Sequence, residues 1–158
     1  MKIERRFTTD TAYGDIAFVE TGTDIRNPDG SVLFRDDHVP MPSGFSQVAR
    51  DVMAQSFFHR AGVPAVLKAV PEDGVPEFLW RHEADLAALA GLPEADRFGP
   101  ETSARQVFDR MAGTWAYWGW KGGYFGSEDD ARAYLDEMRF MLARQMAAPA
   151  STQWGNTG

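Results

Sequence analysis

The side chains that could carry out chemistry are few in this chain, and their spacing gives no catalytic centre. The histidines are His38, His59 and His82, and no two of them stand at the spacing of metal ligands. His38 follows two aspartates, but a solvated loop explains that cluster better than a metal site. Lys121 lies in a glycine-rich stretch that lacks the spacing of a phosphate-binding loop, and no Gly-x-Ser-x-Gly elbow marks a nucleophilic serine. We therefore predict neither a catalytic residue nor a metal ligand.

Cysteine is absent from the 158 residues. This excludes disulfides, zinc–thiolate sites, iron–sulfur ligation and thiol chemistry carried by the chain itself. The length predicts one domain, which is long enough to bury a core without a metal or a disulfide.

The charge and hydropathy of the chain exclude two further classes of partner. A net charge of −7 argues against a nucleic-acid polymer, because contacts to phosphates need a basic face. No apolar run has the length of a membrane span, and the opening residues MKIERRF are not followed by the apolar stretch of a secretory signal. We expect a cytoplasmic protein with no membrane partner.

Six aromatic side chains are concentrated in the eleven residues 115–125. Such a cluster can stack on bases or sugars, but no basic groove accompanies this one. Trp115 and Trp118 continue the apolar face of a predicted helix, so we expect Tyr117 and Trp120 to cover a neighbouring subunit or domain. These four residues are our predicted partner interface, in which replacing Tyr117 and Trp120 by serine should abolish binding and leave folding intact.

The elements that must position these side chains begin with strands and turns over residues 1–40. We expect a short strand over residues 1–8, an alternating strand over 15–21, and a hairpin that turns at residues 27–30. The proline-rich residues 39–44 should end this section.

Residues 46–146 are expected to be mostly helical. Ser46 can cap a first helix that ends near residue 61. A weaker helix is expected over residues 77–90, between irregular segments at 64–76 and 92–100. The inward side chains of the first helix should be Val48, Val52, Met53 and Phe57.

Two longer helices follow, and both carry clear end signals. Thr102 or Ser103 caps a helix that ends at Gly122, with Val107, Met111, Trp115 and Trp118 on one face. Ser127 and the acids behind it open a last helix that runs to about Arg144. The inward residues of this last helix should be Ala131, Tyr134, Leu135, Met138 and Leu142.

These elements together predict a mainly helical α+β fold. We expect one domain over residues 1–146, with about four helices, followed by a loop-like tail at residues 147–158.

Whole segments of the sequence resemble the N-terminal region of adenosylcobalamin-dependent (class II) ribonucleotide reductases. The matching stretches are MKIERRF at the start, DIRNPDGSVLFR at 24–35, SQVARDVMAQSFFHRAGVP at 46–64, RFGPETSARQVFDRMAGTWAYWGWKGGYF at 97–125, and residues 149–158. The long stretch at 97–125 is the most specific of them.

The resemblance implies a part in making deoxyribonucleotides for DNA replication. In this family, adenosylcobalamin generates a thiyl radical on a cysteine of a large α/β barrel, and a cysteine pair supplies the reducing equivalents. A chain without cysteine would be an N-terminal domain or split subunit that is inactive alone and is partnered by the cysteine-bearing barrel. It would reach a ribonucleotide, preferably a diphosphate, through that barrel, and would bind no cofactor by itself. The alternative is a non-catalytic interaction module or a truncated remnant.

The resemblance also places residues 149–158 near the phosphates of the substrate. The family usually has Pro-Asn-Ser-Pro-Gln-Trp-Phe-Asn-Thr-Gly there, and hydroxyl and backbone N–H groups of such a loop suit an anion. The matching residues that we predict to bind substrate are Ser151, Asn156, Thr157 and Gly158. The residues that depart from the family are Ala150, Thr152 and Gly155. These departures should loosen the loop and remove an apolar anchor.

Overall fold

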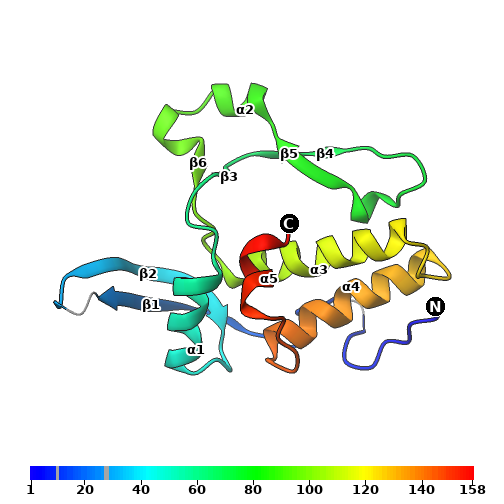
Figure 1. Cartoon of the computed structure of the whole chain (residues 1–158), viewed down its shortest axis with the longest axis horizontal. Coiled ribbons are helices and arrows are strands. Elements are labelled where there is room, and N and C mark those ends of the chain that lie inside the picture. The colour runs from blue at the N-terminus through cyan, green and yellow to red at the C-terminus, as the bar shows by residue number, and fades with distance from the viewer. Residues whose placement is uncertain (10, 27–28) are drawn as a thin grey trace.

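The computed structural model describes residues 1–9, 11–26 and 29–158. Two long helices, α3 (Ala104–Lys121) and α4 (Glu128–Ala143), lie side by side at its centre (Figure 1). A β-hairpin and short helices gather at one end of this pair, and an arm of residues 63–100 crosses above α3. The predicted class, a mainly helical α+β fold, is confirmed.

Strands β1 (Phe18–Arg26) and β2 (Val32–Pro42) form the antiparallel hairpin. The predicted break at residues 39–44 is wrong for its first part, because β2 continues through Val39 and Met41, which are buried in the core. Burial against other elements therefore extends the strand into a proline-rich stretch. The first two residues of the predicted turn, at 27–28, lie outside the described residues.

The N-terminal residues 1–8 form no strand, contrary to the prediction. Their backbone groups are hydrogen-bonded instead by acidic side chains of α4. Ile3 N–H donates to Asp130 Oδ1 at 2.7 Å, and Thr8 N–H and Oγ1–H donate to Glu137 Oε1 at 2.9 and 2.7 Å. Burial opposes ionisation of Glu137, but these hydrogen bonds outweigh it and lower its pKa.

Helix α1 (Gln47–Val52) starts as expected, with Ala49 N–H donating to Ser46 Oγ at 3.2 Å. It continues as a π-helical turn and ends at Phe57, short of residue 61. Met53 is buried and Phe57 packs on the core, as predicted, but Val48 and Val52 are exposed. A helix this short has few neighbours, so its apolar spacing does not decide which side is covered.

The predicted helix over residues 77–90 is wrong. Residues 77–79 form one 3₁₀ turn, residues 81–84 pair with a strand that the sequence did not indicate, and only the end of the stretch is α-helical. Asp85 starts that helix by accepting a hydrogen bond from Ala88 N–H. The elements of the arm are β3 (Val63–Pro64) paired with β6 (Phe98–Gly99), β4 (Leu67–Val70) paired with β5 (Arg81–Ala84), and α2 (Leu86–Ala90).

Helices α3 and α4 have the ends that the sequence predicts. Ser103 and Gln106 form a reciprocal capping box, and α3 ends directly before Gly122. Ser127 caps α4 by accepting a hydrogen bond from Asp130 N–H at 3.2 Å. Ala131, Leu135 and Leu142 of α4 are buried, as predicted.

The core divides into two clusters, and α3 contributes to both. Its first half places Val107, Phe108 and Met111 in a cluster with the hairpin and α1. Its second half places Ala112 and Ala116 in a cluster with α4 and the arm. The buried face is rotated by roughly 100° in the second half, because a different set of elements covers it.

Because of this rotation, the prediction that Trp118 lies on the buried face of the helix is wrong. Trp118 follows the spacing of Val107 and Met111, yet it is 54% exposed. At this end of the helix, α4 and the arm pack on the side of Ala112 and Ala116.

The predicted loop-like tail is also wrong in part. Residues 151–156 form a short helix, α5 (Ser151–Asn156), whose Trp154 is buried. The burial of this one indole against Phe57, in the π-helical turn that follows α1, supplies a reason for the segment to fold back on the core.

Candidate functional site

The C-terminal segment, residues 151–158, holds all four predicted substrate-binding residues. Its Trp154 ring stacks on Phe57 with the ring centroids 4.6 Å apart and the planes 12° from parallel. Ser151, Asn156 and Gly158 are exposed, whereas Thr157 is buried. Three of the four are therefore accessible to solvent, and the side chain of Thr157 is not.

A largely buried arginine of α3, Arg110, holds this segment. Arg110 Nη1 donates to the carbonyl oxygen of Trp154 at 2.9 Å and to that of Thr157 at 2.5 Å. Its Nε and Nη2 donate to Glu101 Oε1 and Oε2 at 2.8 and 3.1 Å. The guanidinium thus joins a carboxylate on one side to two backbone carbonyls on the other.

Glu101 is fixed in turn by the chain that leaves α1. Its Oε2 accepts a hydrogen bond from His59 N–H at 2.7 Å, and its own N–H donates to the His59 carbonyl at 2.8 Å. The carboxylate is almost fully buried, and all its close partners are donors. Such satisfaction is what allows a charged pair to remain inside a protein.

The end of the segment lies very close to the arginine. Gly158 has a φ of +90°, and a Cβ at this position would overlap Arg110 Cγ. Both the left-handed backbone and the close approach require glycine here.

The sequence analysis did not identify Arg110 or Glu101. Arg110 stands three residues after Val107 and beside Met111, next to the apolar face of a predicted helix. A charge in that position can bury its head group only with a partner, which was the available signal.

The aromatic stretch at the other end of α3 contacts the arm of the same chain. Tyr117 Oη–H donates to Glu72 Oε2 at 2.8 Å, and Trp120 Nε1–H donates to the Gly74 carbonyl at 2.7 Å. Trp115 packs partly against the first core cluster. Within the predicted interface, Trp118 is therefore the side chain that stays exposed.

The arm contact is also electrostatic. Lys121 Nζ lies 2.5 Å from Glu72 Oε1. The hydrogen bonds from Lys121 and then Tyr117 lower the pKa of the Glu72 carboxyl, and the carboxylate in turn raises the pKa of Lys121.

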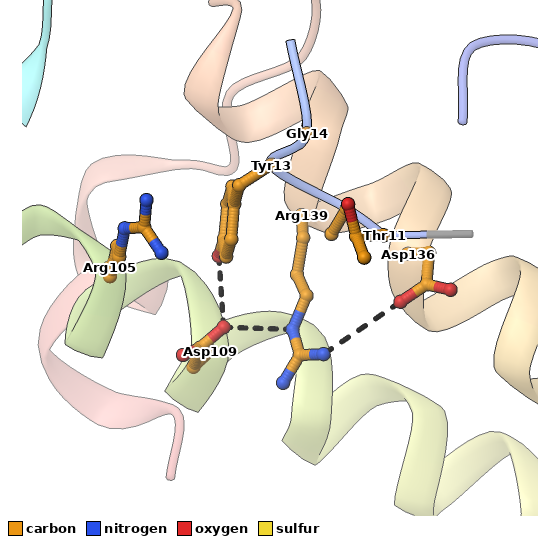
Figure 2. A pocket seen from close by; sticks show the side chains of 8 residues that line it. Thr11, Tyr13, Gly14, Arg105, Asp109, Asp136 and Arg139 are labelled. Atoms are coloured by element: carbon orange, nitrogen blue, oxygen red, sulfur yellow. Dashed lines mark hydrogen bonds and ion pairs between the residues drawn. The ribbon is translucent and has the colours of Figure 1, made fainter. Parts of the chain in front are cut away.

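A shallow cleft of about 550 Å³ opens between residues 11–14 and helices α3 and α4 (Figure 2). Of its charged groups, Arg105 lies over the Tyr13 and Phe18 rings, and the other three pair with one another. Tyr13 Oη–H donates to Asp109 Oδ1 at 2.9 Å, Arg139 Nε lies 2.8 Å from the same oxygen, and Arg139 Nη1 lies 3.8 Å from Asp136 Oδ1. Burial, followed by the charge of Asp109, raises the pKa of Tyr13, so the phenol keeps its proton and remains a donor.

Two further properties concern the described part of the chain. There, no group of three or more His, Cys, Asp or Glu side chains is arranged to hold a metal ion. None of the helices there combines the length and the apolar character needed to cross a membrane.

Comparison with known proteins identifies relatives over the whole chain. A family described as class II vitamin B12-dependent ribonucleotide reductase matches residues 19–145. The chain is 59% identical to the vitamin B12-dependent ribonucleotide reductase of Agrobacterium fabrum and 58% identical to that of Bradyrhizobium diazoefficiens. It is 24% identical to the reductase of Rhodopirellula baltica. All of the chain is covered in each comparison, but it spans only 12–13% of the length of these relatives.

Proposed function

The chain belongs to the class II vitamin B12-dependent ribonucleotide reductases, and from this we propose that it is an N-terminal domain that works with a cysteine-bearing catalytic barrel. The observation that carries the proposal is a match of high identity over the whole chain that spans a small part of each relative. The complete protein reduces ribonucleotides to deoxyribonucleotides, which supplies DNA replication in the cytoplasm. The domain contributes structure and part of the wall on the substrate side.

The radical and redox chemistry belongs to the rest of the enzyme. A thiyl radical and a reducing cysteine pair need thiols, and this chain has none. Adenosylcobalamin would supply the initiating radical when bound, but the residues here do not fit it. The cleft beside Tyr13 has the volume of a site for a drug-sized molecule, which a corrinoid with its nucleotide exceeds, and its Asp109, Asp136 and Arg139 pair with one another.

The exposed side of the C-terminal segment is the proposed contact with the ribonucleotide. Ser151 and Asn156 carry side-chain donors for a phosphate group, and both are exposed. Gly158 is exposed, and its backbone would be the group that contacts the ligand. Thr157 has a different role, because its N–H donates to the Gln153 carbonyl and its carbonyl accepts from Arg110. We assign Thr157 to holding the segment in place.

The proposed contact with the barrel uses the exposed part of the aromatic stretch. Trp118 and Tyr124 are more than half exposed, whereas Tyr117 and Trp120 are engaged with the arm. A large exposed aromatic side chain is typical of an interface residue.

A chimeric enzyme tests this function. In the Agrobacterium fabrum reductase, the region that matches the chain is replaced by the chain, and conversion of CDP to dCDP is measured with adenosylcobalamin and a dithiol. We expect activity that the reductase lacking this region does not show. A folded but inactive chimera would contradict the proposal and favour an interaction module. Adding the chain as a separate polypeptide to the truncated reductase tests the split-subunit form, and CTP in place of CDP tests the preference for diphosphates.

A further inference from the structure

The contacts of Arg110 carry a role beyond stability. We propose that Arg110 is a positioning residue that sets the orientation of the C-terminal segment towards the ribonucleotide, with Glu101 holding the guanidinium in place. This inference rests on the proposed function of the segment and names the residue that acts through it.

The geometry requires arginine in particular. The Nε and Nη2 groups donate to Glu101, and Nη1 donates to the carbonyls of Trp154 and Thr157. Nη2 also donates to the Phe57 carbonyl at 3.3 Å. These contacts use the planar array of N–H groups that only a guanidinium offers. A lysine ammonium has three donors on a single atom and cannot reach both sides of this arrangement.

The position of the guanidinium is itself determined from outside the segment. Glu101 lies directly before the capped start of α3 and accepts a hydrogen bond from His59 N–H. The carboxylate is therefore attached to two parts of the core before it meets Arg110. A shift of the arginine would break several charge-assisted hydrogen bonds together.

Apolar packing alone would not orient the segment. The stack of Trp154 on Phe57 buries area, but burial is non-directional and tolerates sliding and rotation of a six-residue helix. The two carbonyls bound by Arg110 lie at Trp154 and Thr157, on either side of Asn156. Holding both of them determines how the Asn156 backbone is presented to solvent.

The first test measures the segment itself. Hydrogen–deuterium exchange of the full chain is compared between the native protein and Arg110→Lys. We expect faster exchange confined to residues 151–158, with the amides of α3 and α4 unchanged. Exchange of the segment that is as slow as in the native protein would overturn the proposal. The matched control is Arg105→Lys, which changes an exposed arginine of the same helix and should leave the segment unaltered.

The second test separates KM from kcat in the chimeric reductase. We expect Arg110→Lys to raise the KM for CDP about tenfold, with a smaller change in kcat, because the phosphate contacts lose their alignment. A purely structural role would lower the amount of active enzyme and leave KM unchanged, which would overturn the proposal. The chimera with arginine at position 110, prepared in parallel, should show the lower KM.

Ser151→Ala distinguishes the substrate contact from the positioning role of Arg110. If Ser151→Ala raises KM and Arg110→Lys does not, the substrate contact stands and the positioning role is overturned. If both raise KM, both are supported. If neither Ser151→Ala nor Asn156→Ala changes KM, the substrate contact is overturned, and the positioning role towards the ribonucleotide is overturned with it.

Discussion

The two halves of α3 each hold a distant segment through a carboxylate, but they do so in different surroundings. In the first half, Arg110 and Glu101 have side chains that are 12% and 4% exposed, and they hold the C-terminal segment. In the second half, Lys121 and Glu72 are 49% and 22% exposed, and they hold the arm. The two ion pairs therefore contribute differently to the stability of the fold, because water screens the second pair and not the first.

The packing around the two ion pairs also differs between the two halves of α3. The first half fills its surroundings with the large side chains of Phe108 and Met111. The second half buries Ala112, Ala116 and Gly119, so neighbouring elements approach the helix closely. The Phe125 ring occupies the space that a Cβ on Gly119 would need. The packing of the first half is determined by the shape of large side chains. The packing of the second half is determined by small residues that allow close approach.

The largest effect should come from breaking the buried pair. Arg110→Met leaves the Glu101 carboxylate without its partner, and we expect the free energy of unfolding to fall by about 3–5 kcal/mol. Denaturant unfolding followed by tryptophan fluorescence measures this change. Lys121→Met is the matched variant in the exposed pair and should cost much less.

A double variant tests whether this loss comes from leaving one charge without its partner. Arg110→Met combined with Glu101→Gln removes both charges, so its loss should be clearly smaller than the sum of the two single losses. Equal losses in Arg110→Met and Lys121→Met would show that burial does not distinguish the two halves.

The next effect concerns the small residues of the second half. Ala116→Leu adds volume where the side chain is fully buried against the second cluster, and we expect a loss of about 1–3 kcal/mol. Thermal unfolding by circular dichroism provides the measurement. Ala88→Leu makes the same change at an exposed position of α2 and should leave the midpoint nearly unchanged. If Ala116→Leu is tolerated as well as Ala88→Leu, close approach is not what specifies this half.

A smaller effect is expected at the start of α3. Ser103→Ala removes the hydroxyl of the capping box that begins the first half of the helix, which should cost about 1 kcal/mol. Chemical unfolding of this variant can be compared with that of Ser56→Ala, which alters an exposed serine. Identical midpoints for the two variants would contradict a contribution from the cap.

The smallest effect is the pH response of the exposed pair. The pKa of Glu72 is lowered from its usual 4.5 and that of Lys121 is raised from its usual 10.5. The contribution of Glu72 is therefore present above pH 4.5 and is lost as the pH falls through its lowered pKa. The contribution of Lys121 is present below pH 10.5 and is lost as the pH rises through its raised pKa.

The indole N–H of Trp120, which donates to the Gly74 carbonyl, reports on this contact. Its proton chemical shift should be constant well inside the window from 4.5 to 10.5 and should change outside it. A titration near neutral pH would contradict this assignment, and the Trp80 indole, which donates to the Val75 carbonyl, is the internal control.

The parts of the fold that were predictable are those determined by neighbours in sequence. Ser103, Gln106 and Gly122 define the ends of α3 through hydrogen bonds that span one turn or less. Ser127 and the acids behind it do the same for α4. Such bonds form between residues that are already close along the chain, so the sequence alone specifies them.

The candidate site was predictable only in its location. The resemblance over residues 149–158 indicated which segment we propose to meet the substrate, but it predicted a loop and did not indicate what holds it. A short helix of six residues has little stability by itself, and it forms here because Trp154 finds a place against Phe57. Its family motif could be read from the sequence, but its conformation could not.

The sequence by itself determined the family, the absence of thiol chemistry and the two capped helices, since these depend on residue types and on spacings within a few positions. The tertiary structure decided that Trp118 is exposed, that Tyr117 faces the arm of its own chain, and that Arg110 binds Trp154, 44 positions away. Contacts of this kind depend on which elements meet in space. A residue pattern along one helix carries no information about which partner covers each of its sides.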